Sequence, residues 1–152
     1  MLILFIIVLF VTTAVLFTLA KWRDLRAGRL MDGEWIVTTS LTDSALRPLI
    51  VEAMKGRDSA ARVRRRGTAY EREIEETSGN MRNSATLRVW VKQGDDRVRE
   101  VHCEIAGWEG PTKFGLRMVT SVNVCASLIR SIVSDIRRTD PSAEVVSKPG
   151  GK

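Results

Sequence analysis

An uninterrupted apolar segment opens the chain, and a polar body follows it. Residues 2–20 (LILFIIVLFVTTAVLFTLA) contain no charged side chain, and threonines are their only polar residues. As a helix this segment would be about 28 Å long, close to the ~30 Å hydrocarbon core of a bilayer. Its apolar residues surround the whole helix circumference, which is typical of a helix that faces lipid. The sequence therefore predicts a transmembrane anchor over residues 1–20.

The flanks of this segment predict a retained anchor and its orientation. Only Met1 precedes the apolar run, the run is longer than the core of a cleaved signal peptide, and residues 17–20 (FTLA) are a poor cleavage site. The basic and aromatic residues that follow are Lys21, Trp22, Arg23, Arg26 and Arg29. Positive charge marks the cytoplasmic side of a span, and tryptophan favours the membrane interface. We therefore expect a basic juxtamembrane linker over residues 21–33, with the N-terminus outside and the body in the cytoplasm.

Strand and helix patterns alternate along residues 34–139. The β-branched and aromatic run at 34–40 (EWIVTTS) predicts a strand. Apolar residues at helical spacing predict one helix from about residue 44 to Gly56 and a second one over 122–138. Period-two alternation and turn residues predict further strands at 61–76 (broken near Gly67), 86–92, 98–106 and 112–120. We expect residues 140–152 to be a flexible tail.

This element order, β-α-β-β-β-β-α, predicts an α+β domain. Two helices with one apolar face each would cover one face of a meandering antiparallel sheet of about five strands. The order is similar to a helix-grip arrangement, in which a curved sheet wraps around a C-terminal helix. That similarity concerns element order alone, and a shared fold does not establish a shared function.

Composition narrows the class of protein. The chain has 152 residues, a formal net charge of +6 and a sequence pI of about 9.9. This length holds one domain and excludes a multidomain enzyme or a multi-span transporter. Two cysteines exclude a disulfide-stapled scaffold, and they are compatible with a reducing compartment.

No residue pattern predicts a catalytic, metal or cofactor site. His102 and Cys103 are neighbours on a predicted strand, so their side chains point to opposite faces. The chain has no second histidine that could complete a metal site. We interpret Cys103 and Cys125 as core residues and His102 as a surface side chain. Phosphate-binding glycine motifs are absent from the sequence. Glu71, Glu73, Glu75 and Glu76 could supply paired carboxylates, but Glu71, Glu73 and Glu75 share one face of a predicted strand and are expected to form an outward, solvated row.

A basic cluster is the strongest candidate binding feature. Its arginines are Arg57, Arg62, Arg64, Arg65 and Arg66, and the acidic row follows at once. These charges could pair across a hairpin or stay solvated. They could also bind an anionic surface, for which lipid headgroups at the cytoplasmic leaflet are the favoured partner. Nucleic acid is disfavoured because no aromatic-and-basic recognition motif accompanies the cluster.

These features together predict a single-pass membrane protein whose cytoplasmic domain binds rather than catalyses. Its expected role is that of an accessory or assembly protein, with the bilayer and a protein of a membrane complex as partners. A tethered carrier of small hydrophobic ligands or lipids is the alternative suggested by the helix-grip order. An enzyme with an unrecognised site is the third hypothesis.

Overall fold

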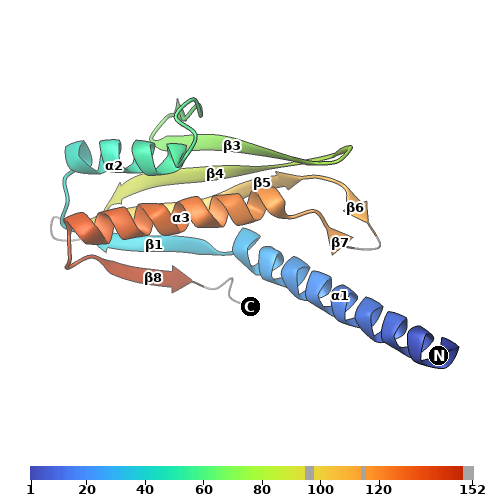
Figure 1. Ribbon diagram of the computed structural model, residues 1–152. Helices are drawn as coiled ribbons and strands as arrows, with labels where there is room; N and C mark the ends of the chain where they lie inside the picture. The colour runs from blue at the N-terminus through green and yellow to red at the C-terminus, as the bar shows by residue number, and fades with distance from the viewer. Residues whose placement is uncertain (95–97, 114–115, 149–152) are drawn as a thin grey trace.

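The computed structural model describes residues 1–94, 98–113 and 116–148 (Figure 1). It is an α+β protein with an N-terminal helix, a six-stranded antiparallel sheet and two further helices. The helices are α1 (Leu2–Met31), α2 (Asp43–Lys55) and α3 (Thr120–Thr139). The strands are β1 (Glu34–Thr39), β2 (Arg64–Arg66), β3 (Ala69–Ser78), β4 (Met81–Gln93), β5 (Arg99–Glu109), β6 (Thr112–Lys113), β7 (Leu116–Arg117) and β8 (Glu144–Lys148).

Helix α1 is long and apolar enough to cross a membrane, which fits a membrane anchor or a signal sequence. Its hydroxyl groups are satisfied within the helix, because Thr12, Thr13 and Thr18 each donate to a carbonyl one turn back at 2.7–2.8 Å. The helix continues through the segment expected to be a linker and ends at Met31. Residues 21–31 are rich in Lys, Arg, Leu and Ala, which are strong helix formers, and they contain no proline.

The last turns of α1 pack into the domain. Ala27 is fully buried in the main core. The Arg117 guanidinium donates from Nε to Asp24 Oδ1 at 2.7 Å and from Nη2 to the Asp24 carbonyl at 3.3 Å. Gly28 allows this approach, since a Cβ there would lie 3.0 Å from Arg117 Nη2. These contacts fix the direction in which α1 leaves the domain (Figure 1).

The sheet has the strand order β2-β3-β4-β5-β1-β8, and all neighbours are antiparallel. Both α2 and α3 lie on one face of it (Figure 1). The predicted helical stripes are confirmed, because the largest fully buried side chains include Leu46, Ile50 and Met54 of α2 and Ile129, Ile132 and Ile136 of α3. They pack with strand residues such as Leu87 and Val89 in one hydrophobic core.

Two expectations about strands were wrong. The sheet has six strands rather than about five, because residues 144–148 form β8 at its edge instead of a flexible tail. Asp140 positions this segment: it is 7% exposed and accepts hydrogen bonds from Thr39 Oγ1 at 2.6 Å and the Ser40 amide at 2.8 Å. The single strand expected at 112–120 is replaced by the two-residue strands β6 and β7 and the start of α3. Residues 95–97, between the strands expected at 86–92 and 98–106, lie outside the described residues.

Candidate functional site

The arginines of the basic cluster are all exposed. Arg57 follows α2, Arg62 precedes β2, and Arg64–Arg66 form the edge strand β2. The strand register pairs Arg64 with Glu71 and Arg65 with Tyr70. Because faces alternate along a strand, Arg64 shares the helix-free face with the acidic row, whereas Arg65 lies on the face that α2 and α3 cover.

The acidic row lies beside this cluster on the helix-free face. Arg62 and Arg64 line a hollow of about 250 Å³ together with Glu71, Glu73 and Glu75. Glu71 nevertheless pairs with Arg88 of β4 at 2.8 Å, which raises the pKa of that guanidinium through the hydrogen bond. Among the residues that the structure describes, none of the five cluster arginines forms an ion pair. Glu71, Glu73 and Glu75 lie on the outward face as expected, and the ion pairs of Glu71 and Glu75 are with β4 residues rather than with β2.

The residues expected to lie beside the membrane are on the part of α1 that follows its apolar segment. The side chains of Lys21, Trp22, Arg23, Arg26 and Arg29 are exposed. The Arg26 guanidinium lies 5.5 Å from the centroid of the Trp22 ring, which is within cation–π distance. Along α1 these residues alternate with the positions that pack into the domain, such as Asp24 and Ala27. Their side chains therefore stay free to contact a surface around the helix.

His102 is not a surface side chain, contrary to the sequence interpretation. It is only 4% exposed although it lies on the helix-free face. Its ring stacks on Trp90 with centroids 5.1 Å apart, and its nitrogens contact Glu34 at 2.5 Å and Glu100 at 3.1 Å. Neighbouring side chains on β1, β4 and β5 therefore bury it, which the alternation of β5 alone does not reveal.

Both cysteines are buried and free, as expected for core residues. Burial raises the pKa of the Cys103 and Cys125 thiols to about 12. Thiols of this kind are poor nucleophiles at neutral pH. Within residues 1–94, 98–113 and 116–148, no group of three or more His, Cys, Asp or Glu side chains could hold a metal ion.

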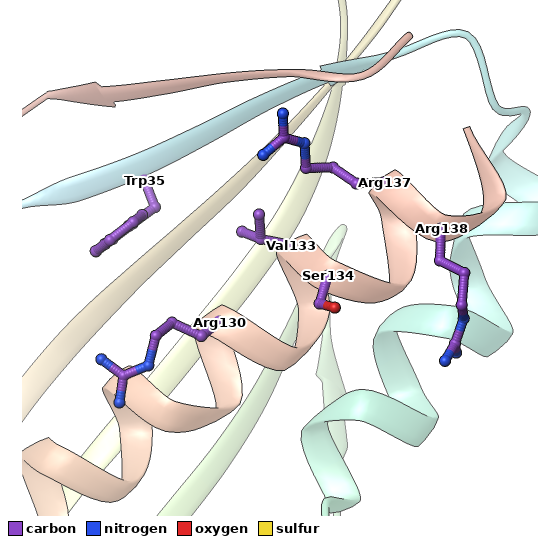
Figure 2. Close-up of a pocket in the computed structure, with 6 residues that line it drawn as sticks. All are labelled: Trp35, Arg130, Val133, Ser134, Arg137 and Arg138. Atoms are coloured by element: carbon purple, nitrogen blue, oxygen red, sulfur yellow. The ribbon is translucent and has the colours of Figure 1, made fainter. Parts of the chain in front are cut away.

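A second basic surface, on the helix-covered side, is a groove between α3 and β1 with a volume of about 470 Å³. Its lining residues are Trp35, Arg130, Val133, Ser134, Arg137 and Arg138. Arg130, Val133 and Arg137 project from α3 toward the Trp35 ring, whereas Arg138 projects to the other side of the helix (Figure 2). Helical spacing explains this, because positions i, i+3 and i+7 share one side of a helix.

The charge of this groove is available to a ligand. Arg138 pairs with Asp135 at 2.8 Å, but Arg130 and Arg137 make no ion pair in the described part of the chain. Trp35 is half-buried, so one part of the indole packs on the domain and another part faces the groove. Two free guanidinium groups on either side of an apolar strip can bind carboxylate or phosphate groups bidentately while the strip contacts apolar atoms.

Sequence reasoning missed this groove. Arg137 and Arg138 were visible at the end of α3, where they also complement the helix dipole. The signal that could have found the groove is the Arg130–Val133–Arg137 spacing, but Trp35 is almost one hundred residues away in the chain. No protein-family model matches this chain, and no curated protein sequence matches it.

Proposed function

We propose that this is a single-pass membrane protein whose cytoplasmic domain binds an acidic segment of a protein partner in the groove between α3 and β1. In this proposal Arg130 and Arg137 bind the carboxylates and Trp35 provides the apolar contact. The domain acts as an accessory or assembly module and catalyses no reaction. The observation that carries the proposal is the pair of unpaired arginines flanking Trp35.

The continuous helix α1 supports a protein partner over a lipid in this groove. From Lys21 to Met31 the helix rises by about 15 Å at 1.5 Å per residue. The headgroup layer of one leaflet is roughly 5–8 Å thick. Trp35 follows the end of α1 by only four residues. When the apolar part of α1 spans the hydrocarbon core, the rise of about 15 Å exceeds the thickness of the headgroup layer, so the groove at Trp35 begins beyond the headgroups. A partner that reaches this height from a neighbouring membrane protein would meet the groove.

The arginine strand β2 lies still farther from α1. Four strand spacings separate β2 from β1, which corresponds to about 19 Å. Figure 1 places β2 on the side of the domain away from the apolar end of α1. This placement favours a solvated or protein-contacting role for Arg62, Arg64, Arg65 and Arg66 over the lipid contact expected from their charge.

The hydrophobic-ligand alternative has less support. The order β1, α2, β2–β5, α3 keeps its similarity to a helix-grip arrangement. A carrier of that kind needs space between its sheet and its long helix. Here fully buried side chains such as Leu87, Ile129 and Ile132 occupy that interface.

Site-specific photocrosslinking of the full-length chain in its native membrane tests the proposal. A photoreactive amino acid replaces Ser134 in the groove, and a matched control carries it at Glu52, an exposed position on α2. We expect a discrete protein adduct from position 134 only, with an acidic segment at the crosslinked site. The double variant Arg130→Glu/Arg137→Glu should lose this adduct with an unchanged melting temperature. An adduct that survives charge reversal, or that forms equally from position 52, contradicts the proposal.

A further inference from the structure

A second groove lies where α1 meets the domain. It has a volume of about 710 Å³, and α1 forms one wall and the β7–α3 junction the other. Leu16 and Leu19 line the α1 wall, and Leu116, Met118 and Val119 line the opposite one. The groove therefore joins the apolar surface of α1 to an apolar strip of the folded domain.

The position of this groove along α1 determines whether lipid or water surrounds it. Leu16 and Leu19 lie in the last turn and a half of the apolar segment, at the boundary between hydrocarbon and headgroups if α1 spans the bilayer. The docking of Asp24 against Arg117 holds the β7–α3 junction beside this boundary. The same junction would be exposed to water in a chain without a membrane.

The groove also carries positive charge at its polar end. Arg23 lines it and is exposed, and it makes no ion pair among the described residues. Arg117 lines it as well, but its guanidinium is already bonded to Asp24. An apolar trough that ends at a free arginine next to Trp22 matches a phospholipid, whose acyl chain and phosphate meet at the depth where tryptophan anchors a helix.

We infer that this groove binds an anionic phospholipid of the cytoplasmic leaflet, with an acyl chain between Leu19 and Leu116 and the phosphate at Arg23. The domain is then attached to the membrane by more than its anchor, because the β7–α3 junction contacts the bilayer surface directly. This inference rests on the proposed membrane anchor, and it is independent of the acidic partner proposed for the groove between α3 and β1.

Quenching by a labelled lipid tests the inference on the full-length chain. A bimane fluorophore is attached to a cysteine at Asn123, an exposed residue of the groove. The chain is reconstituted in phosphatidylcholine vesicles that contain phosphatidylglycerol with a doxyl group on one acyl chain, near its top to quench position 123 and, in separate vesicles, near its end to quench a probe in the middle of the bilayer. Cys103 and Cys125 stay unlabelled because they are buried. Bimane at Leu9, in the middle of the apolar segment, and at Arg57, beyond α2, provides the references.

We expect strong quenching at positions 9 and 123 and none at position 57. Arg23→Gln should weaken the apparent affinity of the site at position 123 for the labelled lipid by about fivefold, the effect of one basic residue near an anionic surface. Arg26→Gln is the matched control, since Arg26 is exposed on α1 but does not line the groove, and it should have a smaller effect.

Two results would overturn the inference. In the first, position 9 is quenched but position 123 is quenched no more strongly than position 57. This result would show an intact membrane anchor and a groove that holds no lipid. The second is an equal effect of Arg23→Gln and Arg26→Gln, which removes the phosphate site. Absence of quenching at position 9 would instead contradict the membrane anchor itself.

Discussion

Truncation of Ile132 provides the sharpest test of how α3 packs on the sheet. Ile132 is 1% exposed in the main core, whereas its neighbour Ser131 is exposed. Replacing a buried isoleucine by alanine removes apolar contacts and leaves a cavity, which costs about 2–5 kcal/mol. For a domain of this size 1 kcal/mol corresponds to a shift of roughly 3–6 °C, so Ile132→Ala should lower the melting temperature by about 6–30 °C. Ser131→Ala should change the stability by no more than about 0.5 kcal/mol.

The assay is thermal unfolding of the full-length chain in detergent micelles, followed by near-ultraviolet circular dichroism. This signal reports the packing of aromatic side chains in the domain, whereas α1 contributes mainly to the far-ultraviolet signal. Ile132→Asp should prevent folding of the domain, because it buries an unpaired charge, and Ser131→Asp should be tolerated. Equal melting temperatures for Ile132→Ala and Ser131→Ala would refute the packing of α3 described above.

Two further predictions concern titratable groups. Hydrogen bonds from Ser142, Thr39 and Ser40 hold the pKa of the Asp140 carboxyl well below its usual range. The carboxylate therefore stabilises the fold above the pKa of the unfolded chain, near 4, and this contribution is lost as the pH falls through acid values. The melting temperature of the wild type should fall more steeply below about pH 5 than that of Asp140→Asn, and parallel curves would contradict this role. Raised thiol pKa values predict that Cys103 and Cys125 resist a disulfide reagent at pH 8 in the folded chain and react after denaturation. Rapid modification of the folded chain would show that the thiols are accessible.

Local sequence patterns were sufficient to predict most of the helices and strands. The apolar stripe on α3 is long and regular, and β1 is a run of β-branched and aromatic residues that follows Asp32 and Gly33, so both elements were predictable from the sequence alone. β8 was missed because a five-residue segment after Pro141 has too little pattern to indicate a strand. Its place is decided by tertiary contacts: it pairs along β1, and Asp140 just before it accepts hydrogen bonds from Thr39 and Ser40.

The candidate sites were harder to predict because they combine distant segments. The arginine run at 62–66 is contiguous and therefore conspicuous, but its position far from α1 depends on the strand order. The groove at Trp35 needs the approach of β1 to α3, and the groove at Leu19 needs the salt bridge between Asp24 and Arg117. His102 shows the same limit: alternation placed it on the correct face, while its burial depends on Trp90 from the adjacent strand.

Location of the domain relative to the membrane tests the central claim most directly. Arg57 is exposed beyond α2, so a cysteine at this position reports on the accessibility of the domain. The chain should resist extraction from membranes by carbonate. In intact cells a membrane-impermeant maleimide should leave the Arg57→Cys variant unlabelled, and it should label the variant once the membrane is opened. Labelling in intact cells, or recovery of the chain in the soluble fraction, would contradict a cytoplasmic domain anchored by α1.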